Sequence, residues 1–330
     1  MSTVPITIAC GNYDRTAAIR DGRVKIEGCE VTYLSLEPEE IFHRAFRFEE
    51  FDVCEMSFSS FIRTVANGTA AYVGIPAFVS RIFRHSGIYV RTAAGIHRPQ
   101  DLRGKRVGVP EYQITAVVWM RGMLQHEYGV HPSEIHWYSG GQEQPGRQER
   151  TPLKSIRGVD LQPIRDDQTL VGMLKAGELD ALFTARAPSS FIAGDAHIAR
   201  LFADTRAAEI AYYKKTGLFP IMHLVGIRKT LAERYPWLAT SVYKAFCEAK
   251  ALAMSNLTEI TALPVMLPFL EAETRETTAA MGRDFWRYGV HENLREIEAL
   301  AQYAFEQGLL ERKVKVDELF CPATLEMSRI

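Results

Sequence analysis

Short β-type runs alternate with helical runs along the first third of the chain, and this alternation constrains the fold more than any other feature. We expect strands at residues 6–10, 31–36, 51–56, 72–78 and 87–91, and helices at residues 39–48 and 59–66. A rhythm of this kind is typical of an α/β unit in which helices cover a sheet.

A second α/β unit begins after residues 92–106, where Gly, Pro and charged residues gather. Beyond this boundary we expect strands at 107–109 and 180–184, helices at 114–128 and 169–176, a long loop at 140–153, and then helices at 237–255, 258–270, 274–288 and 294–307. The pattern predicts a discontinuous first lobe (1–95 and 193–330) around an inserted second lobe (96–192). Because open α/β sheets bind ligands at the carboxyl ends of their strands, we expect a ligand cleft between the lobes.

Charge and composition indicate a small-molecule ligand. The chain has 39 basic and 40 acidic residues among 330, which gives a formal net charge of -1 and no general basic field for a nucleic acid. Its 47% hydrophobic content supplies ample core material for two lobes. We therefore expect a small-molecule partner and no nucleic-acid partner, and the sequence leaves a homo-oligomer open.

The expected compartment is the cytoplasm. The amino-terminal segment has no signal-peptide pattern, and no window approaches the roughly 20 apolar residues that span a bilayer, so no membrane association is expected. The five cysteines form no CxxC pair, which is typical of reduced thiols. We also find no P-loop, no HExxH motif and no GxSxG motif, so we expect no metal and no cofactor, and the sequence leaves open a metal site assembled from distant segments.

Polar segments that follow the expected strands resemble one enzyme family, and the likeness runs nearly end to end. The segments are CGNYDRT (10–16), FDVCEMSFSSF (51–61), SRIFRHSGIYV (80–90), GKRVGVPEYQITAVVWMRG (104–122), PGRQE (145–149), MLKAGELDAL (173–182), RAPSSF (186–191), TGLFPIMH (216–223), YPWLATSVYKAF (235–246), MGRDFWRYG (281–289) and EQGLL (306–310). They resemble the 4,5-dihydroxyphthalate decarboxylase family. The resemblance implies a two-lobed, periplasmic-binding-protein-like (type II) α/β fold, as in solute-binding proteins for thiamine precursors, nitrate and sulfonates.

The same resemblance implies loss of carbon dioxide from a hydroxylated aromatic dicarboxylate, giving 3,4-dihydroxybenzoate (protocatechuate). A hydroxyl para to the departing carboxylate lets the ring carbon take up a proton before carbon dioxide leaves. Such a reaction needs a base near the phenol, an acid near the ring carbon and cations for the carboxylates. It needs no cofactor.

Three residues are candidates for proton transfer. His85, expected on an apolar strand, is the first choice and His223, in a matching segment, is the second, because imidazole changes its charge near neutral pH. Glu111 is a carboxylate expected at the cleft, where burial could raise its pKa. The alternatives are a core histidine bound to a backbone carbonyl and a carboxylate that positions an arginine. Most of the other seven histidines are expected to be solvated.

The candidate substrate-binding residues are polar or aromatic side chains in matching segments. They are Asn12, Tyr13, Arg15, Glu55, Ser57, Ser59, Ser60, Arg81, Tyr112, Thr115, Arg147 and Arg186. Arginine forks suit planar carboxylates, with Arg81 and Arg186 as the first choices, and hydroxyls at a helix start offer an anion site. Salt bridges, helix capping and core packing are the alternatives for these residues.

Two other functions remain open from the sequence. A binding protein could capture an aromatic acid or a thiamine-like precursor on the same fold without turning it over. A ligand-sensing domain is disfavoured because no DNA-binding or signalling segment accompanies the lobes.

Overall fold

The computed structural model describes residues 3–147, 156 and 158–327, and the chain divides into two compact units. The first unit comprises Met1–Arg81, Ile221–Glu298 and Val314–Ile330, and the second comprises Ile82–Pro220 and Ala299–Lys313. The expected lobe boundaries after residues 95 and 192 both fall inside the second unit. The physical reason is that the strands on either side of them, 88–91 and 198–200, pair with each other in the second unit's sheet.

The first unit is built on a five-stranded sheet of order β2-β1-β3-β11-β4. Its elements are β1 (Val4–Cys10), α1 (Asp14–Arg20), β2 (Cys29–Ser35), α2 (Pro38–Phe48), β3 (Val53–Ser57), α3 (Phe58–Ala66), β4 (Tyr72–Arg81), β11 (Ile221–Arg228), α8 (Lys229–Arg234), α9 (Leu238–Asn256) and α10 (Leu270–Met281). Strand β1 runs parallel to β2 and β3, whereas β11 runs antiparallel between β3 and β4.

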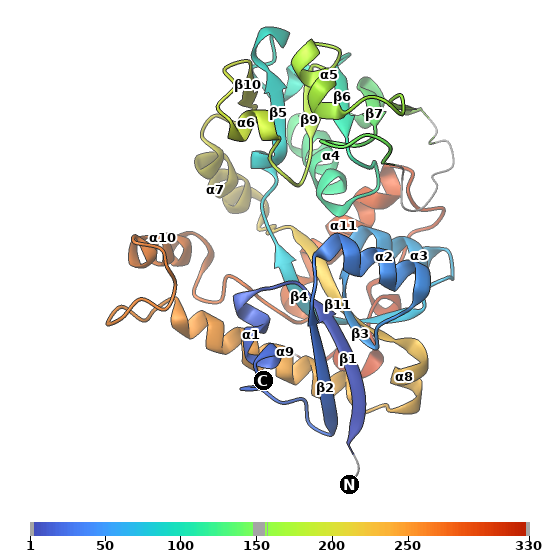
Figure 1. Ribbon diagram of the computed structural model, residues 1–330, viewed down its shortest axis with the longest axis vertical. Helices are drawn as coiled ribbons and strands as arrows, with labels where there is room; N and C mark the ends of the chain where they lie inside the picture. The colour runs from blue at the N-terminus through green and yellow to red at the C-terminus, as the bar shows by residue number, and fades with distance from the viewer. Residues whose placement is uncertain (1–2, 148–155, 157, 328–330) are drawn as a thin grey trace. The chain divides into compact units, whose positions relative to one another are not determined.

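Strand β3 is the centre of this sheet, and all five of its residues are buried. Helix α2 covers it with an apolar face made of Ile41, Phe42 and Ala45. Helices α1 and α9 pack against each other, and α9 also contacts β4 (Figure 1). The register brings the carboxyl ends of β1, β3 and β4 and the amino end of β11 to one edge of the sheet, since His223 lies opposite Ser57.

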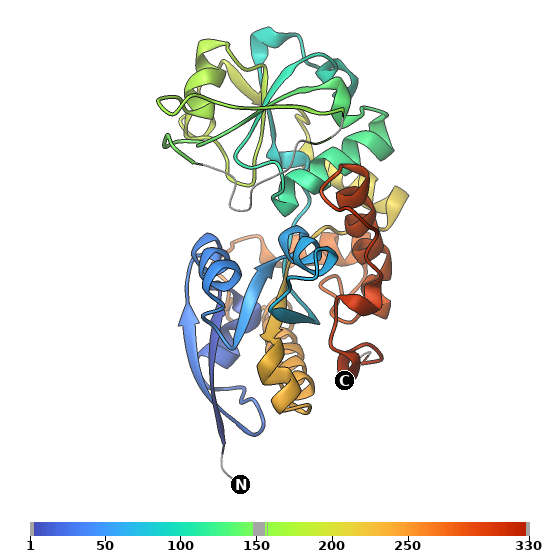
Figure 2. The ribbon, with the colours of Figure 1, turned by 90° about the vertical axis from the view of Figure 1, so that its right-hand side faces the viewer.

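The second unit contains a six-stranded sheet of order β10-β5-β9-β6-β7-β8 with helices on its two faces (Figure 2). Its elements are β5 (Ile88–Arg91), β6 (Arg106–Val109), α4 (Thr115–Tyr128), β7 (His136–Ser139), β8 (Asp160–Pro163), α5 (Leu170–Ala176), β9 (Ala181–Phe183), α6 (Ser189–Ile192), β10 (Ile198–Arg200) and α7 (Thr205–Thr216), with the larger part of α11 (Leu294–Glu306).

Apolar packing on both sides explains why α4 carries no amphipathic pattern. Ten consecutive residues, Thr115 to Leu124, are buried. Gly122 allows α11 to approach closely, because a Cβ atom at this position would overlap the ring of Tyr303. On α5, Leu170 and Leu174 pack with Leu182 of β9.

The strands and helices expected for residues 6–91, 107–128 and 169–184 lie at their expected places, with one exception: His85 begins a short 3-10 helix (His85–Gly87) and does not lie on a strand. The predicted helix at 258–270 is wrong. Pro264 and Pro268 restrict the backbone before them and lack N–H donors, so α10 begins only at Leu270. That helix ends at Met281, before Gly282 with φ of 88°, and not at residue 288.

Several elements have no counterpart among the expectations: α1, α6, α7, α8, β7, β8, β10 and β11. Residues 140–147 of the expected long loop form no regular element, and residues 148–153 lie outside the described residues. All five cysteines are free thiols. Within the described ranges, no helix has the length and hydropathy needed to cross a bilayer.

A buried ion pair fixes the end of β4. Arg81 donates from Nη2 to Glu296 Oε1 at 2.8 Å and from Nη1 to Asn293 Oδ1 at 2.6 Å, and the side chains of Arg81 and Glu296 are 1% and 2% exposed. Nη1 also donates to the backbone carbonyl of Arg287. The pair therefore ties β4 to the start of α11 within the first unit.

We predict that Glu296→Ala lowers the free energy of unfolding by about 3–5 kcal/mol, because it leaves the Arg81 guanidinium buried without its carboxylate. Chemical denaturation followed by circular dichroism measures the change. The control is Glu298→Ala on the same helix, whose exposed side chain should change stability by less than about 0.5 kcal/mol. Equal effects of the two substitutions would contradict the prediction.

Candidate active site

A buried carboxylate binds several polar groups at the edge of the first unit's sheet where β1, β3 and β4 end. Glu55 on β3 is 0% exposed. Its Oε1 lies 2.5 Å from Nδ1 of His223 and accepts a 2.7 Å hydrogen bond from the Tyr13 hydroxyl. Its Oε2 accepts from the backbone N–H of Gly11 at 2.8 Å and from the Cys10 thiol at 3.5 Å. We refer to Gly11, Tyr13, Glu55 and His223 as the Glu55 cluster.

The cluster keeps Glu55 ionised. Burial by itself would raise the pKa of this carboxyl, but the nearby His223 and the hydrogen bonds from His223, Gly11 and Tyr13 outweigh burial and lower the pKa. Burial and the adjacent Glu55 charge raise the pKa of Tyr13, so its hydroxyl stays a donor. Because an ionised carboxylate only accepts hydrogen bonds, Nδ1 of His223 must carry a proton.

Local backbone geometry explains how the cluster forms. Gly11 follows β1, and a Cβ atom there would lie 2.6 Å from Cζ of Tyr13, so only glycine lets the Tyr13 ring fold back toward Glu55. His223 lies on β11 opposite Ser57 of β3 and Ser80 of β4. The Phe42 ring and the imidazole pack in a T-shaped arrangement with 4.8 Å between their centroids. The His223 side chain is 18% exposed, so solvent reaches part of it.

Arg15 is held flat between two aromatic rings. Its guanidinium carbon lies 4.2 Å from the centroid of the Tyr13 ring and 4.3 Å from that of Trp286. Nε donates to the Val79 carbonyl at 2.6 Å, and Nη1 donates to Asp14 at 3.1 Å. Trp286 is fixed in turn by a 2.9 Å hydrogen bond from Nε1 to the Phe78 carbonyl. Nη2 of Arg15 has no partner among the described residues and is available to an anion.

The remaining first-unit candidates take different places. Ser57 and Ser59 are buried where β3 passes into α3, and the Ser60 hydroxyl donates to that of Ser57 at 3.2 Å. Asn12 is exposed, and its carbonyl oxygen accepts from Arg20.

Arg81, which we expected to bind a substrate carboxylate, has its guanidinium bound by Glu296 and Asn293. The structure therefore places Arg81 in the salt-bridge alternative.

The second unit contains its own polar pair after β6. Glu111 is 1% exposed, and its Oε1 accepts from Arg147 Nη2 at 2.6 Å and Nε at 3.1 Å. This is the alternative in which the carboxylate positions an arginine. Tyr112 is fully buried beneath the guanidinium of Arg121, 3.5 Å from the ring centroid.

Two further candidates lie in the second unit. Thr115 is the first residue of α4 and is buried. Arg186 is exposed, and its backbone carbonyl accepts from Gln142. The expectation that residues of both lobes share one cleft stays a prediction.

His85 lies in an aromatic cluster of the second unit and not beside a carboxylate. It is 1% exposed, and the rings of Phe202 and Tyr212 contact it edge-on at 4.9 and 5.2 Å between centroids. Neither ring nitrogen has a hydrogen-bond partner among the described residues. Burial lowers the pKa of His85 to about 4, so its imidazole is neutral at neutral pH.

The other histidines fit the solvated interpretation, since all seven are exposed: His43, His97, His126, His131, His136, His197 and His291. In the described part of the chain, no three His, Cys, Asp or Glu side chains gather in a group that could hold a metal ion.

Sequence reasoning did not single out Trp286 and Phe42. Trp286 stands in the matching segment 281–289, which was the available signal, but an indole carries no charge and nothing in the sequence places it beside Arg15. Phe42 reads only as a core residue of an amphipathic helix, and its contact with His223 depends on the sheet order.

We predict that Tyr13→Phe destabilises the protein by about 1.5–3 kcal/mol at neutral pH, because ionised Glu55 loses a donor. A lowered pKa adds stability above the carboxyl's usual pKa, and this stability is lost as pH falls through the folded-state pKa. The difference from wild type should therefore shrink in the acid range, as measured by denaturation at several pH values. Tyr235→Phe, whose ring contacts Arg234 and Trp237, is the control, and a pH-independent difference for Tyr13→Phe would refute the assignment.

Comparison of the solved structures confirms the fold that the resemblance implied. The periplasmic aliphatic sulphonate binding protein SsuA from Escherichia coli aligns with a TM-score of 0.53 at 14% identity, over 99% of this chain and 100% of that one. The alkanesulfonate-binding protein SsuA from Xanthomonas axonopodis pv. citri aligns with a TM-score of 0.52 at 13% identity, over 97% and 99%. At these identities the likeness concerns the α/β fold alone.

Comparison of sequences gives the family. No family model matches the chain. The 4,5-dihydroxyphthalate decarboxylase of Comamonas testosteroni is 45% identical over 330 residues, 100% of both chains. That of Pseudomonas putida is 43% identical over 214 residues, 65% of this chain and 83% of the relative. This protein belongs to the 4,5-dihydroxyphthalate decarboxylase family.

Proposed function

We propose that this protein is a carboxy-lyase that converts 4,5-dihydroxyphthalate to 3,4-dihydroxybenzoate, with His223 and Glu55 as its proton-transfer pair. Family membership with 45% identity along the whole chain supports the reaction. The observation that carries the residue assignment is the 2.5 Å contact between His223 and a carboxylate that burial and three donors isolate from water.

The reaction requires one proton for each carbon dioxide released. When the hydroxyl para to a carboxylate loses its proton, electron density moves to the ring carbon that bears the carboxylate. That carbon takes up a proton, the ring becomes a dienone, and breaking the bond to the carboxylate restores the aromatic ring as carbon dioxide leaves. The dienone carbonyl accepts the electron pair of the broken bond and becomes the phenolate again, so the substrate supplies its own electron sink and we propose a reaction without a cofactor.

His223 is suited to the first proton transfer. Glu55 holds its Nδ1–H, which leaves Nε2 with a lone pair that can accept the phenolic proton. The imidazolium that forms is stabilised by the buried Glu55 charge. A carboxylate that orients and stabilises an imidazole in this way is a recurring arrangement in general base catalysis.

Arg15 is suited to binding a substrate carboxylate. The Tyr13 and Trp286 rings fix its plane before substrate arrives, which reduces the entropy lost on binding. Its Nη2 can donate to the carboxylate, while Nε and Nη1 remain bound to Val79 and Asp14. Tyr13 contacts both Arg15 and Glu55, so it links the carboxylate-binding and proton-transfer groups.

We predict that His223→Gln lowers kcat by about 10²–10⁴-fold, the range typical of a lost general base. The assay incubates purified protein with 4,5-dihydroxyphthalate and follows carbon dioxide and 3,4-dihydroxybenzoate. His126→Gln is the matched control, because His126 is an exposed histidine paired with Glu306 in the second unit. Tight substrate binding by the wild-type protein without product would favour a binding protein and contradict the proposed function.

A separate variant tests His85, the other candidate for proton transfer. We predict that His85→Phe keeps kcat near the wild-type value, because a neutral imidazole among aromatic rings is replaced by an apolar ring of similar size. Thermal unfolding should show no loss of stability, since no hydrogen bond to the imidazole disappears. Loss of turnover in a folded His85→Phe protein would return His85 to the mechanism.

A further inference from the structure

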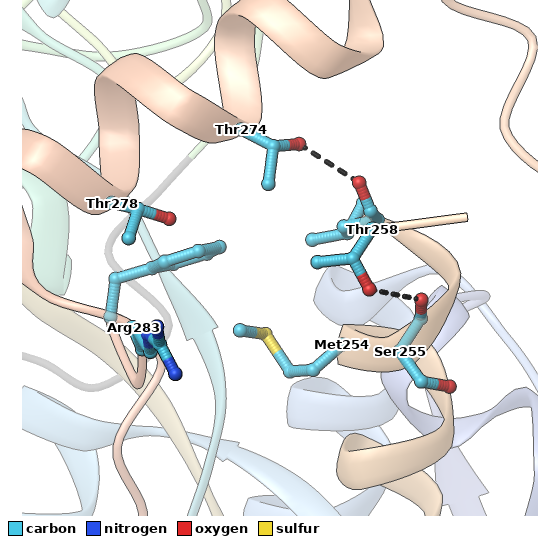
Figure 3. Close-up of a pocket in the computed structure, with 8 residues that line it drawn as sticks. Met254, Ser255, Thr258, Thr274, Thr278 and Arg283 are labelled. Atoms are coloured by element: carbon cyan, nitrogen blue, oxygen red, sulfur yellow. Dashed lines mark hydrogen bonds between the residues drawn. The ribbon is translucent and has the colours of Figure 1, made fainter. Parts of the chain in front are cut away.

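A cavity of about 480 Å³ lies between the end of α9, the start of the following loop and α10 in the first unit (Figure 3). It is lined by Met254, Ser255, Leu257, Thr258, Thr274, Thr278, Arg283 and Phe285. None of these residues belongs to the Glu55 cluster. The volume is within the range of small-molecule sites, roughly 300–1,000 Å³.

Two threonines of the lining, Thr258 and Thr274, present apolar groups to the cavity because their hydroxyls bind backbone carbonyls. The hydroxyl of Thr258 donates to the Ser255 carbonyl at 2.9 Å, and that of Thr274 donates to the Leu257 carbonyl at 3.2 Å. Their methyl groups face the cavity, as does the end of the Met254 side chain (Figure 3). With Leu257 and Phe285, these groups form a surface suited to a flat apolar ring.

Two of the lining residues, Arg283 and Thr278, can donate hydrogen bonds to an anion. Arg283 is exposed, and its guanidinium makes no salt bridge or hydrogen bond within the described part of the chain. The Thr278 hydroxyl likewise has no hydrogen-bond partner in the described residues, and it points into the cavity (Figure 3). No carboxylate lines the cavity. The charge of the lining therefore favours an anion.

We propose that this cavity is a second binding site, which takes an aromatic monocarboxylate. The ring lies against Met254 and Phe285, and the carboxylate accepts hydrogen bonds from Arg283 and Thr278. One cation and one hydroxyl match a single carboxylate, whereas a dicarboxylate would leave one charge facing the apolar lining. The site therefore selects the class of the proposed product over the class of the proposed substrate.

A short chain segment links the cavity wall to the site around Arg15. Along the segment 283–286, Arg283 and Phe285 line the cavity, while Trp286 stacks on Arg15. Lys250 on α9 holds this segment by donating to Asp284 Oδ1 at 3.0 Å and to the Trp286 carbonyl at 3.1 Å. An occupant that contacts Phe285 thus touches the residue next to the indole that fixes Arg15.

Equilibrium dialysis with radiolabelled benzoate tests the site, and 3,4-dihydroxybenzoate is a second probe whose choice alone rests on the proposed function. The full-length wild-type protein is compared with Arg283→Gln and Phe285→Ala. The control is Arg275→Gln, an exposed arginine of α10 that pairs with Glu271 outside the cavity lining. A parallel titration follows tryptophan fluorescence in wild type and in Trp286→Phe.

We expect Arg283→Gln and Phe285→Ala each to weaken one equivalent of benzoate binding by about tenfold or more, the loss expected for a charge-assisted hydrogen bond or an aromatic contact. Arg275→Gln should bind as wild type does, and Trp286→Phe should lose the fluorescence change but keep the binding. Wild-type protein that binds no benzoate, or Arg283→Gln that binds it unchanged, would overturn the proposal. Absence of turnover with 4,5-dihydroxyphthalate would refute the proposed function but would not change the conclusion from the benzoate-binding measurement.

Discussion

The ionised carboxylate of Glu55 in the middle of a buried strand is the constraint on which the site depends. A charge at such a position must find all its partners inside the protein, because water does not reach it. Gly11 and Tyr13 after β1 and His223 on β11 supply the donors. One residue of β3 thereby fixes the segments on either side of it, and it sets the orientation of the imidazole that carries the proposed chemistry.

The rhythm of the sequence predicted much of the fold, because β1, β2, β3 and their helices follow one another along the chain and pair locally. It missed β11, whose partners β3 and β4 lie far away in the sequence. The unit boundaries were displaced for a related reason: the pairing of β5 with β10 joins residues about a hundred positions apart, which no local pattern reveals.

The site could be predicted in part. Tyr13, Arg15, Glu55 and His223 were all candidates, since each is polar and stands in a matching segment. The sequence put His85 ahead of His223, because the distinction between the two depends on what surrounds each ring, which no local pattern reveals: a buried carboxylate in one case and Phe202 and Tyr212 in the other. Arg81 shows the same limit, since its partner Glu296 lies more than two hundred residues further along.

Because the first unit consists of separate chain segments, its parts are synthesised at different times on the ribosome. Synthesis runs from the amino terminus, so a nascent chain that ends before residue 221 contains Glu55 but not the strand that carries its histidine. Strand β3 then has an open edge, and the carboxylate lacks its strongest donor. The second unit, whose strands are all made by residue 200, completes its sheet first. The Glu55 cluster can therefore form only after all strands of the second unit's sheet have been synthesised.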